Sequence, residues 1–266
     1  MKITFIGGGN MGEAMLAAVL DKKIISPENI VVSDVSQARL EHLKKSYHVR
    51  VMADNSQAVA EGELVILAIK PQNLAQIMAE LKDGLKSGQL VLSIVAGARI
   101  DGLRLGLGHN RIVRVMPNTP AQIGAGISVW TATGDVTQEQ KSEVGRILGA
   151  MGKEIFVADE GYLDMATAIS GSGPAYVFLF AEALVSAALE IGLPEKIAVE
   201  LVLETIVGSG QFARKSDKSL ALLRQVVTSP GGTTAEALSC FEKGKFTDII
   251  IKAVKAAYIR ARELGG

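Results

Sequence analysis

Short, almost uninterrupted apolar runs recur along the first 160 residues, and polar or glycine-rich stretches separate them. Such runs are typical of strands in a parallel sheet, because helices cover both faces of that sheet. The predicted strands are ITFIG (3–7), IVVSD (30–34), LVILAI (64–69), LVLSIV (90–95), RIVRVM (111–116), GISVWTAT (126–133) and EIFVA (154–158). Apolar residues at helical spacing predict intervening helices at 11–22, 36–46, 71–83, 99–107 and 137–151, the last of them opened by Thr137.

The pattern changes after Asp159, beyond which no strand is predicted. Helical spacing of apolar residues continues to the end of the chain, at 161–169, 174–191, 195–214, 218–227, 233–243 and 246–263. The sequence therefore predicts two domains. An α/β domain with a doubly wound parallel sheet occupies residues 1–160, and an all-helical domain occupies residues 161–266.

One predicted helix, PAYVFLFAEALVSAALEI at 174–191, is apolar on most faces and about long enough to span a bilayer. Glu182 lies at its centre, where a charge in lipid is costly. Small residues, mainly alanine, are frequent along it. We therefore expect a buried helix of a soluble protein rather than a transmembrane span.

Composition excludes several classes of protein. Hydrophobic residues make up 48% and charged residues 21%, and the formal net charge is zero, so no basic surface for nucleic acid is indicated. The single Cys240 excludes an internal disulfide and a cysteine-rich metal site, and suits a reducing compartment. The N-terminal apolar run stops at Gly7, too early for a secretory signal. We expect a cytoplasmic protein with no metal site and no nucleic-acid or membrane partner.

The segment GGGNMG (7–12) joins the first predicted strand to the first predicted helix, which is the context that the dinucleotide fingerprint requires. Gly7 permits the tight turn, Gly9 lets the backbone approach a pyrophosphate, and Gly12 lets the helix pack on the strand. The helix start, at Asn10 and Met11, supplies free N–H groups for the phosphates. A nicotinamide dinucleotide is the predicted cofactor.

The choice between the two nicotinamide coenzymes stays open. Asp34 ends the second predicted strand, where its carboxylate can accept hydrogen bonds from the adenine-ribose diol and would repel a 2′-phosphate, which favours NADH. Ser33, Ser36 and Arg39 surround Asp34 in the sequence and could instead hold that phosphate, which favours NADPH.

Ligands of an open parallel sheet bind beyond the carboxyl ends of its strands. Three further segments lie there: AIKPQ (68–72), AGA (96–98) and MPNTP (116–120). Within them, Lys70 could contact a coenzyme ribose or be a solvated lysine, and Asn118 could bond the nicotinamide amide or cap its turn. The candidates for coenzyme contact in these segments are Ala68, Lys70, Pro71, Ala96, Gly97 and Asn118.

The sequence offers little acid–base chemistry. Its three histidines, His42, His48 and His109, fall outside the strand-end loops, and each is expected to be solvated. A hydroxyacid dehydrogenase needs a base for the alcohol proton. In the hydroxyisobutyrate-type family, a Lys and an Asn on the long inter-domain helix remove this proton. The corresponding helix here, at residues 172–191, contains neither residue type. A protonated imine is already electrophilic, so its reduction needs positioning more than a base. The residues therefore favour imine reduction.

A second glycine loop, TSPGGTTAEAL, occupies residues 228–238. Residues 229–232 predict a turn whose glycines expose their N–H groups, directly before a helix. Thr233 with Glu236 matches a capping box, which leaves the Thr234 hydroxyl free for a ligand. The amides and the helix dipole could hold a carboxylate.

Five segments in this order carry a family resemblance: FIGGGNMG, AIKP, MPNTP, SGSGPAY (170–176) and VVTSPGGTTAEAL (226–238). Together they resemble the pyrroline-5-carboxylate reductase family over nearly the whole chain. The resemblance implies NAD(P)H-dependent reduction of 1-pyrroline-5-carboxylate to L-proline, the last step of proline biosynthesis, by hydride transfer to the imine carbon. It also implies a Rossmann-type N-terminal domain and a helical C-terminal domain that binds substrate and intertwines into a homodimer or a higher homo-oligomer.

The resemblance assigns roles in the second loop. Ser229 and the amides of Gly231, Gly232, Thr233 and Thr234 would hold the substrate carboxylate, and the Thr234 hydroxyl would bond the ring nitrogen as the catalytic group. Three alternatives remain: a reductase of another cyclic imine acid such as piperideine-2-carboxylate, a hydroxyacid dehydrogenase, and a non-catalytic dinucleotide-binding regulator. The intact second loop argues against the regulator, which would not need it.

Overall fold

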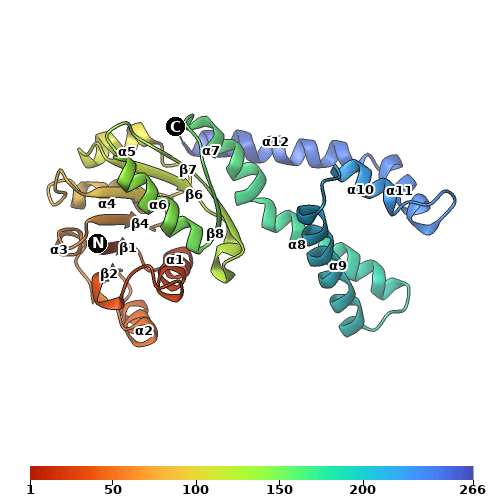
Figure 1. The fold of residues 1–266 in the computed structure, drawn as a ribbon, viewed down its shortest axis with the longest axis horizontal. Helices are drawn as coiled ribbons and strands as arrows, with labels where there is room; N and C mark the ends of the chain where they lie inside the picture. Colours follow the sequence, from red (N-terminus) through yellow and green to blue (C-terminus); the bar gives the residue numbers. More distant parts are fainter. Residues whose placement is uncertain (266) are drawn as a thin grey trace. The chain divides into compact units, whose positions relative to one another are not determined.

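A computed structural model describes residues 1–265, which divide into two compact units (Figure 1). The first unit contains residues 1–172 together with the end of the chain from Ala257, and the second contains Gly173–Ala256. The first unit thus extends twelve residues beyond the predicted boundary at 160/161. It also includes the end of the last helix, which the sequence prediction assigns to the second domain.

An eight-stranded sheet forms the first unit, in the order β3-β2-β1-β4-β5-β6-β7-β8. All neighbouring strands are parallel except β6 and β7, which are antiparallel. The strands are β1 Ile3–Ile6, β2 Ile30–Ser33, β3 Arg50–Met52, β4 Leu64–Leu67, β5 Leu90–Ser93, β6 Ile112–Met116, β7 Gly126–Ala132 and β8 Gly152–Phe156.

Two features of this sheet correct the sequence prediction. The sheet is mixed rather than wholly parallel, because only residues 117–125 join β6 to β7, and a parallel crossover needs a longer connection. The edge strand β3 was not predicted, because its three residues, Arg50, Val51 and Met52, are too few for a periodic pattern.

Helices cover both faces of the sheet, as the sequence predicts. Because successive strand residues point to opposite faces, Phe5 packs into one core and Ile6 into the other. The first core is covered by α1 Asn10–Asp21, α2 Gln37–Tyr47 and α6 Gln138–Ala150, and the second by α3 Asn55–Val59, α4 Leu74–Leu81 and α5 Ile100–Leu107. Thr137 opens α6 through a capping box with Gln140, which confirms its predicted place.

A buried ion-pair cluster joins α7 (Gly161–Ala166) to the sheet. The Arg114 guanidinium of β6 donates to Glu160 and Asp164, both at 2.8 Å, and its side chain is only 5% exposed. Arg99 lies 3.5 Å from the second Asp164 oxygen. These contacts explain why the first unit extends through α7 and a π-helical turn, η4 (Thr167–Gly171), beyond the predicted boundary.

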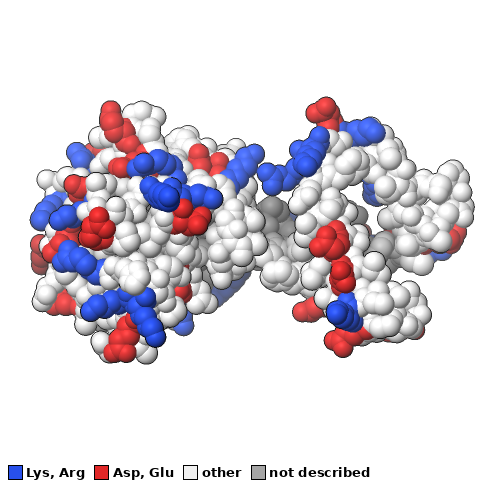
Figure 2. All heavy atoms as spheres, turned by 60° about the horizontal axis from the view of Figure 1, so that its bottom comes forward, with Lys and Arg blue, Asp and Glu red and all other residues white. Residues whose placement is uncertain are grey.

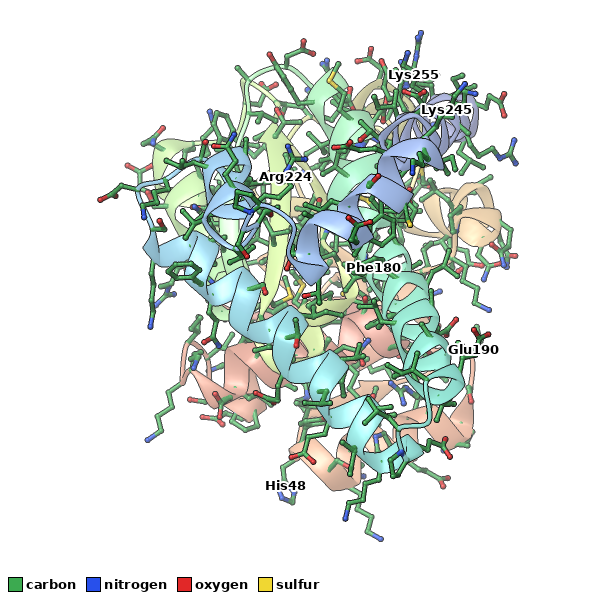
Figure 3. The ribbon with its side chains drawn as sticks, turned by 90° about the vertical axis from the view of Figure 1, so that its right-hand side faces the viewer. His48, Phe180, Glu190, Arg224, Lys245 and Lys255 are labelled. Atoms are coloured by element: carbon green, nitrogen blue, oxygen red, sulfur yellow. The ribbon has the colours of Figure 1, made fainter. Side chains whose placement is uncertain are left out.

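The second unit is helical throughout, and its helices agree closely with the predicted ones. They are α8 Gly173–Glu190, α9 Glu195–Lys215, α10 Leu220–Val226, α11 Thr233–Lys243 and the first part of α12 Phe246–Leu264. Three phenylalanines link α8, α11 and α12: the Phe246 ring lies 6.3 Å from Phe180 and 5.3 Å from Phe241. Figure 3 looks onto this unit and labels Phe180 on α8.

The apolar helix α8 is not covered within the chain, although the sequence predicts a buried helix. None of its residues is buried, and Phe178 and Leu179 are 60% and 67% exposed. Figure 2 shows charged side chains scattered over the sheet-bearing unit and broad uncharged areas over the helical unit. By length and composition alone, the helical stretch 161–190 could cross a membrane. Exposed apolar surface of this extent is typical of sites where proteins associate.

Candidate functional site

Gly7 and Gly9 lie in the turn between β1 and α1, and Gly12 lies in the first turn of α1, and the structure gives a different reason for each glycine. Gly7 has φ +98°, and a Cβ there would lie 2.5 Å from the Ala68 carbonyl oxygen. A Cβ on Gly12 would lie 2.7 Å from the Gly7 oxygen. A Cβ on Gly9 would meet no atom within 4 Å. Chain packing therefore requires Gly7 and Gly12, whereas Gly9 leaves open space above the turn, as close approach of a ligand requires.

The start of α1 offers backbone donors beside that space. Gly9 is the N-cap, and no side chain bonds to the helix end. The N–H groups of Asn10, Met11 and Gly12 have no acceptor within the helix, because a helix leaves its first N–H groups unpaired. Together with the helix dipole they form a site for phosphate oxygens.

Asp34 lies at the carboxyl end of β2 and is held by two backbone donors. The Gly8 N–H donates to Oδ2 at 2.7 Å, and the Ser36 N–H donates to Oδ1 at 2.9 Å. Each carboxylate oxygen keeps acceptor capacity, because it has two lone pairs. The carboxylate is thus oriented next to the glycine turn, where a ribose diol can donate to it.

A polar cluster on α1 and α2 borders this carboxylate. Arg39 donates through Nε to the Gly8 carbonyl and through Nη2 to Glu13. Glu13 Oε1 also lies 2.8 Å from His42 Nε2 and accepts from the Tyr47 hydroxyl at 2.9 Å. Burial would raise the pKa of the Glu13 carboxyl, but the hydrogen bonds from these three α2 side chains hold it below its ordinary value. Arg39 is therefore already paired.

Ser33 does not offer its hydroxyl to a ligand. The residue is fully buried, and its Oγ donates to Asn55 Oδ1 at 2.7 Å. Asn55 in turn donates to Glu80 at 2.9 Å. Sequence reasoning missed Asn55 at this edge of the sheet, because the short elements β3 and α3 that position it carry no periodic signal.

Among the other candidates at the strand ends, Gly97 and Asn118 have structural roles, whereas the Lys70 side chain is exposed. Gly97 has φ +76°, and a Cβ there would lie 2.7 Å from the Leu264 carbonyl oxygen, so the end of α12 requires this glycine. Asn118 Oδ1 accepts from the Ile127 N–H at 2.9 Å and so holds the start of β7. Lys70 is exposed, and Pro71 opens the 3₁₀ turn η2 (Pro71–Asn73) as expected. Ala96, beside Gly97, is half-buried.

The second glycine loop forms a turn followed by a helix N-terminus. The Gly232 N–H donates to the Ser229 carbonyl at 3.1 Å, and Gly231 has φ +68°. With Pro230 at the second position, this is the pattern of a type II turn. A Cβ on Gly232 would lie 2.8 Å from Ser229 Oγ, so the glycine makes room for that hydroxyl.

The predicted capping box at Thr233 is wrong. Gly232 is the N-cap of α11, no side chain caps the helix, and Thr233 occupies its first position. The glycine already has the extended conformation that a cap needs, with φ −84° and ψ 168°. The N–H groups of Thr233, Thr234 and Ala235 therefore remain unpaired within the helix, which is the arrangement that binds a carboxylate. Thr234 is half-buried and Thr233 is exposed.

The three histidines have their contacts outside the two glycine loops. His42 contacts Glu13, and His48 ends α2 with φ +57°. His109 is 6% exposed and contacts the Gln89 carbonyl at 2.8 Å, so the expectation that it is solvated is wrong. Within residues 1–265, no three His, Cys, Asp or Glu side chains are grouped to hold a metal.

The first unit fits a dinucleotide in three respects. Gly9 leaves space, the start of α1 provides N–H donors, and Asp34 presents an oriented carboxylate. The space above Gly9 suits the approach of a pyrophosphate, and the N–H donors suit its negative charge. The carboxylate of Asp34 suits hydrogen bonds from a ribose.

Two family models match the chain. The pyrroline-5-carboxylate reductase dimerisation model matches residues 160–264, and the model described as NADP oxidoreductase coenzyme F420-dependent matches residues 2–97. Among curated proteins, the pyrroline-5-carboxylate reductase of a Synechocystis species is 40% identical over 265 residues, covering 100% of this chain and 98% of its own. That of Pseudomonas aeruginosa is 36% identical, covering 99% and 96%.

Solved structures agree with this relationship. A pyrroline-5-carboxylate reductase from Coxiella burnetii has a TM-score of 0.91 and 38% identity, covering 100% of this chain and 98% of its own. The Plasmodium falciparum pyrroline carboxylate reductase, solved with NADP bound, has a TM-score of 0.92 and 33% identity at the same coverage. The identity over the full length, the shared fold and the matching family models together show that this chain belongs to the pyrroline-5-carboxylate reductase family.

Proposed function

We propose that this chain reduces 1-pyrroline-5-carboxylate to L-proline with NADH or NADPH, the last step of proline biosynthesis. The observation that carries the proposal is the 40% identity to a pyrroline-5-carboxylate reductase over the full length of both chains. Two loops with unpaired N–H groups, one for each anionic ligand, support it. Neither loop segment contains a histidine or a lysine that could remove an alcohol proton, which suits an imine, because an imine is electrophilic once protonated.

The first loop is assigned to the coenzyme. The N–H groups at the start of α1 bind the pyrophosphate, Gly9 admits it, and Asp34 accepts from the adenine ribose. The remaining candidate contacts, at Ala68, Lys70, Pro71, Ala96 and Asn118, follow the ends of β4, β5 and β6. When bound, the reduced nicotinamide supplies the hydride that adds to the imine carbon.

The second loop is assigned to the substrate. The N–H groups of Gly231 and of the first turn of α11, with the Ser229 hydroxyl, bind the carboxylate, whereas the Gly232 N–H closes the turn on the Ser229 carbonyl. The Thr234 hydroxyl hydrogen-bonds the ring nitrogen and so fixes which face of the ring is reduced. Thr233, freed from the capping role, contributes its backbone N–H.

The helical region is assigned to self-association. Residues 161–266 constitute a substrate-binding and dimerisation domain, and residues 1–160 a coenzyme domain. A homodimer would cover the exposed apolar side chains of α8, which the isolated chain leaves in water. On this proposal the protein is cytoplasmic, and neither nucleic acid nor a membrane is its partner.

The test is an assay that follows the loss of reduced-nicotinamide absorbance with 1-pyrroline-5-carboxylate, run in parallel with NADH and NADPH. Turnover should produce proline in equal amount to the coenzyme oxidised. Piperideine-2-carboxylate and small hydroxyacids, the latter with oxidised coenzyme, serve as comparison substrates. Absence of turnover with 1-pyrroline-5-carboxylate and either coenzyme would refute the proposal, and a higher kcat/KM for a comparison substrate would reassign it.

A further inference from the structure

Resting on the proposed function, we propose that Glu13 makes this enzyme prefer NADH to NADPH. Glu13 does not reach the ligand itself. It acts through Arg39, a cation that bonds the Gly8 carbonyl while the Gly8 N–H bonds the Asp34 carboxylate. Glu13 is thus a positioning residue that sets which coenzyme the ribose-binding edge accepts.

Glu13 is the centre of a closed network between α1 and α2. Its two carboxylate oxygens accept from Arg39, His42 and Tyr47, all on α2. The side chains of Glu13 and Arg39 are only 21% and 25% exposed, so water screens their charges less than at an open surface. The ion pair is therefore a stable part of the turn.

The same network restrains the guanidinium of Arg39. One donor is used on the Gly8 carbonyl and another on Glu13, while the N–H of the same Gly8 holds Asp34. A 2′-phosphate is recognised best by a guanidinium that is free to present two parallel donors. The donors that Arg39 keeps free cannot turn independently, because the guanidinium is planar and these two bonds fix its orientation.

The charges at this edge also disfavour a 2′-phosphate. Asp34 and Glu13 are two carboxylates, and Arg39 supplies one compensating cation. The second candidate donor, the Ser33 hydroxyl, is buried and bonded to Asn55. The Ser36 hydroxyl caps α2 by accepting from the Arg39 N–H at 3.4 Å and keeps its O–H as a donor, so a 2′-phosphate would meet one neutral hydroxyl beside the two carboxylates. A ribose diol needs only the free lone pairs of Asp34, whereas a phosphate dianion beside it is repelled.

Calorimetric titration with NAD⁺ and NADP⁺ tests the preference without relying on turnover. The wild-type chain should bind NAD⁺ at least about tenfold more tightly. Glu13→Gln, which frees Arg39, should tighten NADP⁺ binding about tenfold and change NAD⁺ binding less than about twofold. The matched control is Glu61→Gln, because Glu61 pairs with Arg50 at 2.9 Å beside the opposite ends of the strands. It should change neither affinity.

A double-mutant cycle separates this role from a purely structural one. Arg39→Gln should barely alter NADP⁺ binding in the wild-type background, because the guanidinium is already paired, yet it should abolish the gain in Glu13→Gln. A structural defect would instead weaken the binding of both nucleotides equally. Thermal unfolding of each variant measures such a loss of stability separately. An equal loss for both nucleotides in Glu13→Gln contradicts the proposal.

The remaining outcomes are distinct from one another. Wild-type binding of NADP⁺ as tight as that of NAD⁺, or a large loss of NADP⁺ binding on Arg39→Gln alone, overturns the role of Glu13 but leaves the reductase activity standing. If the chain binds NAD⁺ more tightly than NADP⁺ as expected but does not reduce 1-pyrroline-5-carboxylate, the role of Glu13 in coenzyme choice is supported and the proposed function is refuted. Binding of neither nucleotide refutes both.

Discussion

Gly7 and Gly9 lie two residues apart in one turn, and they are glycines for different reasons. Gly7 has a backbone conformation that side chains rarely adopt, and it packs against the Ala68 carbonyl. Gly9 has φ −66°, an ordinary value, with open space where its Cβ would be. The fold requires the first glycine, and a ligand requires the second.

Gly9→Ala should therefore separate binding from stability. We expect its free energy of unfolding to change by less than about 0.5 kcal/mol, while coenzyme affinity falls about tenfold, because the methyl group fills the space for the pyrophosphate. Gly7→Ala should cost about 2 kcal/mol or more in unfolding free energy. Urea unfolding and coenzyme titration measure the two effects. Equal destabilisation by both substitutions would contradict the assignment.

Thr233 and Thr234 form a second matched pair of neighbours. Thr234→Val keeps the shape and removes the hydroxyl proposed to bond the ring nitrogen, so kcat/KM should fall about a hundredfold. Thr233→Val should reduce it less than about threefold, because Gly232, and not Thr233, caps the helix. Steady-state kinetics with 1-pyrroline-5-carboxylate measure both. Similar losses in the two variants would mean that neither hydroxyl has a special role.

Glu13 should also make stability depend on pH. Its pKa is lower in the folded chain than its ordinary value, despite burial, so the unfolded chain binds more protons between the two values. The stabilisation is present above the ordinary pKa and is lost as pH falls through the folded one. Urea unfolding from about pH 6 down to about pH 3 should show a shallower decline in Glu13→Gln than in the wild type. Parallel curves would contradict this.

At the scale of elements, α7 is attached to the sheet by charge. Arg114 is buried on β6 with the carboxylates of Glu160 and Asp164 as its partners. A buried pair is costly to break, because the remaining charge is left in a site that water does not reach. The attachment therefore positions the chain immediately before α8.

Asp164→Asn should lower the free energy of unfolding by about 3 kcal/mol, because it leaves the Arg114 charge partly uncompensated. Glu143→Gln is the matched control, since Glu143 forms an exposed pair with Arg146 at 3.5 Å within one helix. Its effect should stay below about 0.5 kcal/mol. Denaturant unfolding of both variants measures these free energies. A small effect of Asp164→Asn would show that Glu160 alone compensates the charge of Arg114.

At the scale of the whole molecule, the exposure of α8 supports the proposed dimer. None of its residues is buried in one chain, and Phe178 borders a groove that α8 and α9 line. Apolar side chains of this density in water favour association, at roughly 25 cal/mol for each Å² of apolar area covered. The proposed homodimer supplies that cover.

Phe178→Glu should convert the dimer into a monomer, because it places a charge in the covered surface. Leu105→Glu is the control, since Leu105 is 83% exposed on α5 of the sheet-bearing unit. Sedimentation equilibrium measures the mass of each. A wild-type chain that stays monomeric at micromolar concentration, or a dimer that survives Phe178→Glu, would refute the assignment of α8 to the interface.

Much of this protein was predictable because its signals are local. The order of strands and helices, the helices of the second unit and the N-cap at Thr137 follow from apolar spacing and capping residues within a few positions of one another. The same holds for the two glycine loops and for Asp34 at the end of β2. The capping box at Thr233 failed although its pattern was present, because the preceding glycine took the cap position.

By itself, the sequence determined the elements, their order and the two loops with unpaired N–H groups, since these depend on residues within one or two turns. Only the tertiary structure decided which distant groups meet. The contact of Gly97 with Leu264 and the pairing of Glu13 with Arg39 join residues far apart along the chain. The physical reason is that such contacts arise from the packing of elements against one another, and no local pattern of apolar and polar residues encodes them.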